Sequence, residues 1–111
     1  MTARLPAHLE VSGLLRSVEN SGGFAMVLQR GERDAGTILI VTRERGEAAA
    51  LWERMPQLDG SRLFTKTRNQ SDEDSQDFEA YLERRRRQDP DSWLIELDIV
   101  NPERFISTLV T

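Results

Sequence analysis

The sequence predicts a single α+β domain over residues 1–111, in which an antiparallel sheet of four to five strands carries helices packed on one face. The length fits one domain. Three segments repeat apolar residues at the helical period, and the segments between them alternate or are rich in β-branched residues. The expected order is helix, three strands, a short further strand, helix, strand and helix.

The first segment, residues 6–20, is predicted to be an amphipathic helix. Pro6 suits the first helical turn, where its missing N–H loses no hydrogen bond, and Gly22 and Gly23 favour a stop at the far end. The apolar residues that share one face at the helical period are Ala7, Val11, Leu14, Leu15 and Val18.

Two strands are predicted next. The segment FAMVLQR (residues 24–30) alternates, which places Phe24 and Met26 on the same face. The segment TILIVT (residues 37–42) is apolar on both faces, which predicts a central strand covered on both sides. The polar connector GERDAG (residues 31–36) is bracketed by glycines and is predicted to be a hairpin loop between the two strands.

The segment AAALWERM (Ala48–Met55) is ambiguous between helix and strand. Alanine favours a helix, but eight residues ahead of Pro56 are short for one, and we interpret the segment as a strand. The chain turns at Gly46, so residues 37–55 form a hairpin in which Trp52 faces either a helix or a partner.

A turn, a short strand and a second helix follow. Pro56–Arg62 contains turn residues, Leu63–Lys66 is a candidate strand, and the polar TRNQSDED is expected to be a loop. Ser71 is placed to cap a helix that runs to about Gln88, with Asp74 in the capping-box position.

That second helix has a narrow apolar stripe. It ends before Pro90, because the residue that precedes a proline avoids the helical conformation. The residues of the stripe are Phe78, Tyr81, Leu82 and Arg85.

The segment DSWLIELDIV (residues 91–100) alternates apolar and charged residues, which predicts a half-buried strand. Asn101 is predicted to cap a last short helix that begins at Pro102. The apolar side of this helix consists of Phe105, Ile106 and Leu109.

Composition excludes much familiar chemistry. Cysteine is absent and His8 is the single histidine, so thiol nucleophiles, thiolate zinc sites and two-histidine metal motifs are excluded. The acidic run Asp72–Asp77 lacks a calcium loop, and no phosphate-binding or activated-nucleophile motif occurs. We therefore expect no cofactor and no metal. A small enzyme with a pocket of buried carboxylates or arginines is an alternative.

The longest apolar runs, residues 38–41 and 48–52, are far shorter than the roughly 18 residues that a membrane span needs. The N-terminal segment also lacks a signal-peptide pattern. We expect a cytoplasmic protein that makes no membrane contact.

The second helix opens with acidic residues and closes with Arg84–Arg87. This order complements the helix dipole without a ligand. Successive helical residues point about 100° apart, so the arginines surround the helix, and Glu83 is spaced to pair with two of them. A net charge of −4 also opposes attraction to nucleic acid. A nucleic-acid-associated protein that uses this helix end is a further alternative.

The sequence favours a non-catalytic binding or protein-interaction module, in which an exposed strand face or edge meets a protein partner or a second copy. The glycine-bracketed connector is included because loops on rigid sheets often carry binding residues. The candidate interaction surface comprises Arg33, Asp34, Trp52, Arg84, Arg86 and Arg87.

Three stretches carry a resemblance to a known family: RLPAHLEVSGLLR, GGFAMVLQRGERDAGTILIV and FEAYLERRRRQDPDSWLIELD, in which the most specific strings are RRRRQDPDSWLIELD and QRGERDAG. On these residues the chain resembles the alphaproteobacterial domain-of-unknown-function family 1491, whose members are small proteins of about this length. It implies a free-standing bacterial protein with one compact domain. It supplies no catalytic residue, cofactor or substrate.

Overall fold

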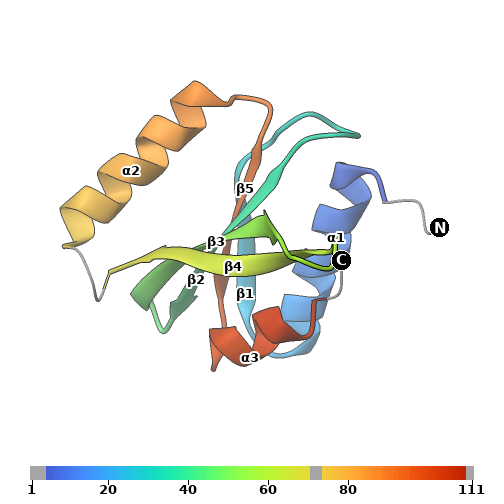
Figure 1. The fold of residues 1–111 in the computed structure, drawn as a ribbon. Coiled ribbons are helices and arrows are strands. Elements are labelled where there is room, and N and C mark those ends of the chain that lie inside the picture. Colours follow the sequence, from blue (N-terminus) through green and yellow to red (C-terminus); the bar gives the residue numbers. More distant parts are fainter. Residues whose placement is uncertain (1–4, 71–73, 110–111) are drawn as a thin grey trace.

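A computed structural model of the chain describes residues 5–70 and 74–109 (Figure 1). The α+β class and the element order predicted from the sequence are confirmed. The elements are α1 (Ala7–Asn20), β1 (Phe24–Gln29), β2 (Ile38–Glu44), β3 (Glu47–Pro56), β4 (Arg62–Asn69), α2 (Ser75–Gln88), β5 (Trp93–Asp98) and α3 (Pro102–Ser107).

The described strands form one five-stranded sheet in the order β1-β5-β2-β3-β4. The strands β2, β3 and β4 are antiparallel neighbours, and residues 38–56 include the predicted hairpin. The last strand, β5, lies between β1 and β2; it is antiparallel to β1 and parallel to β2. The sheet is therefore mostly antiparallel with one parallel pairing, where the sequence led us to expect an antiparallel sheet throughout.

The direction of the strands explains this difference. Because β4 and β5 run the same way, the chain must return along the sheet between them, and α2 makes that return. Local alternation of apolar residues identifies a strand but carries no information on which neighbour it pairs with.

Helices cover both faces of the sheet, so the expectation that they pack on one face is wrong. The strands β2, β3 and β5 carry apolar side chains on both faces, and each face needs cover. Figure 1 shows α2 on the opposite side of the sheet from α1 and α3. The face under α2 is built from Leu39, Val41, Ala49, Leu51, Phe78, Leu82 and Leu94.

The strand β5 is more buried than its alternating pattern predicts. It is an interior strand, and Leu94, expected on the charged outer face, lies buried beneath α2. The residues Trp93, Ile95 and Leu97 join the cluster on the other face, with α1 and α3. The prediction that residues 37–42 form a central strand is confirmed.

The connector GERDAG is not a hairpin loop, because β1 and β2 are not neighbours. It passes over the start of β5, where the Glu32 N–H donates to the Asp91 carbonyl oxygen at 2.7 Å and the Trp93 indole N–H donates to the Glu32 carbonyl at 2.8 Å. A Cβ on Gly31 would lie 2.3 Å from the Asp91 oxygen, and one on Gly36 would lie 2.6 Å from it. The glycines therefore permit close backbone approach.

Two boundaries differ from the predictions. The strand β4 extends to Asn69, so the first three residues of the expected TRNQSDED loop belong to the strand that pairs with β3; this pairing overrides the polar composition. The side chain of Asp74 caps α2 by accepting a hydrogen bond from the Asp77 N–H, and Ser71 lies outside the described residues.

The apolar stripe and the end of the second helix are confirmed, and α3 begins at Pro102 as predicted but ends at Ser107, before Leu109. Phe78 and Leu82 are buried along α2, which ends at Gln88. The Asn101 side chain caps α3 by accepting from the Arg104 N–H. No helix in the described ranges is both long and apolar enough to cross a membrane.

The attachment of α2 to the sheet gives the first prediction. Phe78 is fully buried, so Phe78→Ala is expected to lower the free energy of unfolding by about 3–5 kcal/mol. Phe24 is 78% exposed, and Phe24→Ala is expected to change it by less than about 0.5 kcal/mol. Urea denaturation of both variants measures the difference, and equal losses would contradict this placement of α2.

The second prediction contrasts a glycine that lies against neighbouring backbone with a glycine that has open space around it. Gly31→Ala forces the crossover loop away from β5 and is expected to destabilise the fold by about 1–3 kcal/mol. Gly13 lies within α1 with open space around its Cα, so Gly13→Ala is expected to stabilise by about 0.5–1 kcal/mol. Thermal unfolding followed by circular dichroism checks that the two variants shift Tm in opposite directions.

Candidate functional site

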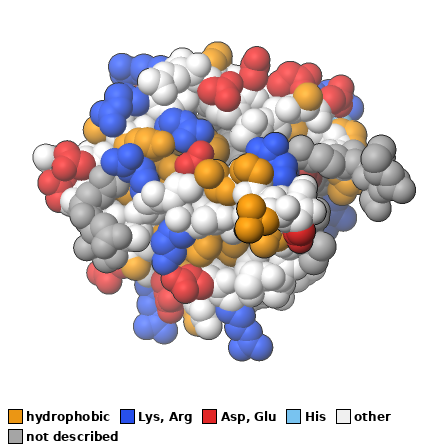
Figure 2. Space-filling model, viewed as in Figure 1, with side chains coloured by type: hydrophobic (Ala, Val, Ile, Leu, Met, Phe, Trp, Pro, Cys, Tyr) orange, Lys and Arg blue, Asp and Glu red, His pale blue; other side chains and the backbone are white. Residues whose placement is uncertain are grey.

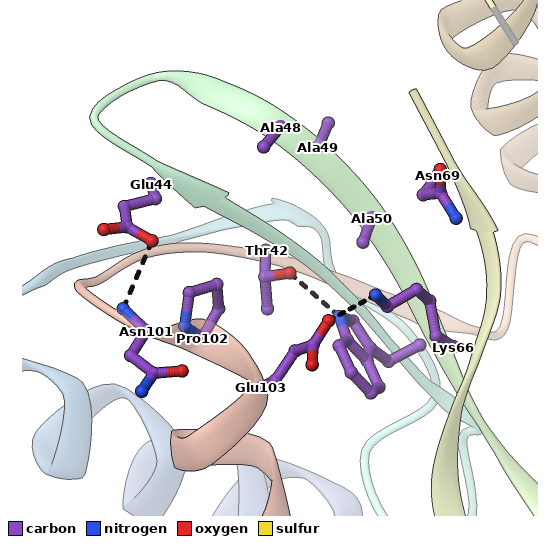
Figure 3. Close-up of a pocket in the computed structure, with 11 residues that line it drawn as sticks. Thr42, Glu44, Ala48, Ala49, Ala50, Lys66, Asn69, Asn101, Pro102 and Glu103 are labelled. Carbon is purple, nitrogen blue, oxygen red and sulfur yellow. Dashed lines mark hydrogen bonds and ion pairs between the residues drawn. The ribbon is translucent and has the colours of Figure 1, made fainter. Parts of the chain in front are cut away.

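A cavity of about 460 Å³ lies where α3 meets the strands β2, β3 and β4 (Figure 3). One wall is apolar and built from alanines, and a few polar side chains approach from the other elements. The residues that line it are Thr42, Glu44, Ala48, Ala49, Ala50, Trp52, Lys66, Asn69, Asn101, Pro102 and Glu103.

Three side chains from three elements meet at one end of this cavity. Lys66 on β4 places its ammonium 5.4 Å from the centroid of the Trp52 ring, which suits a cation–π contact. Glu103 on α3 places its carboxylate oxygen 2.5 Å from the Lys66 Nζ. The Lys66 side chain is 34% exposed and that of Glu103 is 66% exposed. The site therefore holds one charged pair beside one aromatic ring.

Trp52 is held firmly in this arrangement. Its indole N–H donates to the buried Thr42 hydroxyl oxygen at 2.8 Å, and the residue as a whole is 8% exposed. The sequence placed Trp52 on a candidate interaction surface, facing either a helix or a partner. The structure places it in the core on the α3 side, with an edge on the cavity.

The backbone at the other end of the cavity is strained. Ala48 and Asn101 line it with φ angles of 56° and 53°, in the left-handed region that non-glycine residues rarely adopt. The Glu44 carboxylate accepts from the Asn101 N–H at 3.3 Å and ties β2 to the start of α3. Such strain persists only where the surrounding structure enforces it, and it is concentrated at functional sites.

Asp98 fixes the turn beside this strained segment. Its two carboxylate oxygens accept from the Arg45 and Gly46 N–H groups, both at 2.8 Å. Because Asp98 is the last residue of β5, the β2–β3 turn and the approach to α3 are held by one side chain. The turn next to the cavity is thus held in place by the sheet.

The face under α2 carries a separate polar network. The Arg43 guanidinium donates to Glu96 at 2.9 Å and to Glu79 at 2.8 Å, which joins β2, β5 and α2. Burial opposes its charge, but the hydrogen bonds and attraction of the two carboxylates outweigh burial and raise the pKa of Arg43 above its ordinary value. This arginine is a structural tie.

Arg85 makes a second tie between α2 and the sheet. It donates to the Glu53 carboxylate at 2.8 Å and to the Tyr81 hydroxyl at 2.9 Å. Burial again opposes the charge, and these partners raise the pKa of Arg85. The predicted position of Arg85 on the apolar stripe of this helix agrees with its inward direction.

The other arginines at the end of α2 point to different partners. Arg86 donates to the Leu28 carbonyl at 3.1 Å, at the bulge in β1, and lies 3.7 Å from Glu83. Arg87 lies 3.4 Å from the same carboxylate, and Arg84 stands 5.8 Å from the Tyr81 ring centroid. These candidate residues therefore do not form one basic patch. Figure 2 shows acidic and basic side chains interspersed over the face in view.

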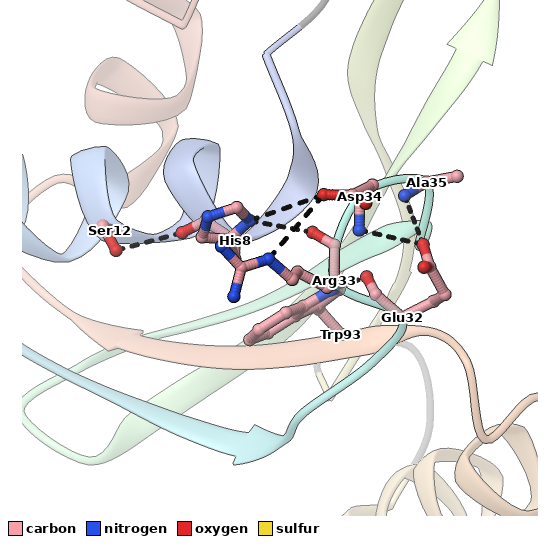
Figure 4. Close-up of polar contacts among 7 residues, drawn as sticks. All are labelled: His8, Ser12, Glu32, Arg33, Asp34, Ala35 and Trp93. Carbon is pink, nitrogen blue, oxygen red and sulfur yellow. Dashed lines mark hydrogen bonds and ion pairs between the residues drawn. The ribbon is translucent and has the colours of Figure 1, made fainter.

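The GERDAG connector caps the start of α1 (Figure 4). The Ala7 and His8 N–H groups donate to the Asp34 and Arg33 carbonyl oxygens, both at 2.9 Å, which satisfies two donors that a helix start leaves unpaired. The side chains of the two candidate residues Arg33 and Asp34 are exposed. The backbone of this loop is structural, and the exposed side chains of Arg33 and Asp34 lie 3.9 Å from each other at its surface.

The structure does not bring the sequence-predicted site residues together. Trp52 lines the cavity, and Arg33, Asp34, Arg84, Arg86 and Arg87 do not. Sequence reasoning missed Lys66 and Glu103, which lie 37 positions apart. Lys66 is the only lysine in the chain, which was a signal, but its meeting with Glu103 depends on the tertiary fold.

The outer strand β1 presents exposed apolar side chains. Phe24 and Met26 face solvent on the α2 side of the sheet, whereas Ala25 and Val27 pack against the core.

Among the described residues, no three His, Cys, Asp or Glu side chains group closely enough to hold a metal ion.

A family model described as a protein of unknown function, DUF1491, matches residues 5–107. No functionally curated protein matches the chain.

Solved structures agree with the family match. A crystal structure of a DUF1491 family protein from Caulobacter crescentus is 33% identical, with a TM-score of 0.75 over 86% of this chain and 88% of that one. An NMR structure of a DUF1491 family protein from the same organism is 29% identical, with a TM-score of 0.73 over 90% of each chain. The solution structure of protein Atu0922 from A. tumefaciens is 32% identical, with a TM-score of 0.68 over 86% of each chain. The chain therefore belongs to the DUF1491 family, whose function is unknown.

Proposed function

We propose that the chain is a non-catalytic binding module of the cytoplasm, and that the cavity between α3 and the strands β2–β4 binds a small molecule. The observation that carries this proposal is the cavity itself. Its volume of about 460 Å³ falls in the range of ligand sites, roughly 300–1,000 Å³. It also combines an apolar wall with a few fixed polar groups, which is the usual composition of such sites.

The chemistry of the lining favours binding over catalysis. The Thr42 hydroxyl is buried and accepts the Trp52 indole N–H, and no histidine lines the cavity to activate it. The alternative of an enzyme calls for buried carboxylates or arginines in a pocket. The Glu103 carboxylate is largely exposed and paired with Lys66, and no arginine is part of this lining.

The alternative of a nucleic-acid-associated protein receives less support. Arg85 and Arg86 are directed at Glu53 and at the Leu28 carbonyl, and Arg87 pairs with Glu83, so three of the four arginines in Arg84–Arg87 make intramolecular polar contacts. A basic patch for phosphates needs several such groups facing one way.

The two tryptophans provide a test of the cavity. We expect small-molecule fragments that bind there to shift the Trp52 indole N–H resonance in ¹⁵N NMR spectra, because that group lies at the cavity. The Trp93 indole N–H bonds to Glu32 in the crossover loop and is expected to stay in place. A fragment screen read on these two resonances, assigned with Trp52→Phe, gives the measurement.

A pair of strand variants controls this experiment. Asn69→Phe puts a ring at the cavity lining and is expected to remove the Trp52 shifts, whereas Thr65→Phe adds the same ring to an exposed position of the same strand and is expected to keep them. Fragments that never move Trp52, or that move it equally in both variants, would refute the proposed site.

The expectation of a protein partner or a second copy at a strand edge stays a prediction. We expect such a partner to bind at the outer edge of β1, which is an edge strand of the sheet and carries the exposed side chains of Phe24 and Met26. Light scattering across a range of concentrations is expected to show a mass increase that Phe24→Glu abolishes. A constant monomer mass for the parent chain would reject self-association.

A further inference from the structure

We infer that the ligand of this cavity is a flat apolar molecule that carries a carboxylate, and that Glu103 occupies the position of that carboxylate. This inference rests on the proposed binding function and names the class of ligand. The charge that a ligand must carry depends on which member of the Lys66–Glu103 pair it replaces.

Lys66 is the fixed cation of the site. Its ammonium is held between the Trp52 ring, 5.4 Å away, and the Glu103 carboxylate at 2.5 Å, and it is the less exposed member of the pair. A cationic ligand that took the place of Lys66 would have to displace it from both contacts. The geometry therefore disfavours a ligand that replaces the lysine.

Glu103 is the exchangeable member. Its side chain is 66% exposed on the short helix α3, so it can turn into water without leaving a buried charge unpaired. Exposed ion pairs are weak, and an incoming carboxylate that takes over Lys66 loses little by displacing Glu103. The contact is an intramolecular competitor for the ligand's anionic group.

The second carboxylate of the cavity does not compete for Lys66. Glu44 lies at the opposite end in Figure 3, where it accepts from the Asn101 N–H. Only the end with Lys66 offers a cation to an external anion, which sets the orientation of the ligand.

The rest of the lining selects an apolar body. Ala50 lies on the same face as Trp52, and Ala48 lies toward the other end of the cavity; both side chains end in a methyl group, so this wall lacks branched side chains. A planar molecule can lie along such a wall with its carboxylate directed at Lys66. Apolar burial then supplies affinity, and the single charge supplies specificity.

The test uses two probes of nearly identical shape, 2-naphthoate and the neutral 2-naphthamide. We expect 2-naphthoate to shift the Trp52 indole resonance and to saturate, and 2-naphthamide to bind about tenfold more weakly, since a hydrogen bond to a charged group is lost. The Trp93 indole resonance reports that the fold is intact throughout.

Two variants assign the effect to the pair. Glu103→Gln removes the competitor and is expected to tighten 2-naphthoate binding about two- to fivefold, with Glu19→Gln on α1 as a charge-matched control that changes nothing. Lys66→Met is expected to weaken 2-naphthoate about tenfold and to leave 2-naphthamide unchanged. Arg62→Met, on the same strand outside the cavity lining, is the control for lost positive charge.

The outcomes separate this inference from the proposed function. If both probes shift Trp52 equally and Lys66→Met affects them alike, the cavity is a binding site but its ligand is not anionic, and the inference is overturned. If 2-naphthoate moves Trp52 in neither the parent chain nor Glu103→Gln, yet other fragments do, the carboxylate class is again wrong. If no small molecule moves Trp52, the proposed function fails with it.

Discussion

The insertion of β5 between β1 and β2 is the constraint on which the other features of this molecule depend. An interior strand needs partners on both edges and cover on both faces, and each need is met by a different part of the chain. The helix α2 carries the chain back across one face, α1 and α3 close the other, and the GERDAG loop passes over the start of the strand. Leu94 and Ile95 face opposite ways, so the loss of either cover would expose an apolar surface.

The cavity is a product of the same insertion. Because β5 ends beside β2, its last residue Asp98 holds the β2–β3 turn, and Ile99 donates to the Arg43 carbonyl. The chain then reverses at Asn101 in a left-handed conformation, which lays α3 against the sheet. Glu103 reaches Lys66 from this position. The charged pair beside Trp52 thus follows from where the last strand pairs.

Local patterns predicted the elements, and non-local contacts decided the rest. The period of apolar residues located α1 and α2. The segment Ala48–Met55 was identified as a strand in spite of its alanines, because the stretch between Gly46 and Pro56 is short for a helix. The partners of β5 could not be predicted from its sequence. Its apolar residues, among them Trp93 and Leu94, are compatible with a strand covered on one face and with a strand covered on both. For the site, the pattern singled out Trp52, but the contact between Lys66 and Glu103 depends on the placement of α3, which no spacing in the sequence encodes.

The late position of β5 in the chain has a consequence for biosynthesis. Ribosomes add about 5–20 residues per second, and the strands β1 and β2 emerge well before the residues that will join them. Until residues 93–98 leave the exit tunnel, the nascent chain carries two unsatisfied strand edges and cannot close its sheet. The sheet can therefore close only after residues 93–98 have emerged, and a chain truncated upstream of β5 is expected to keep the facing edges of β1 and β2 open.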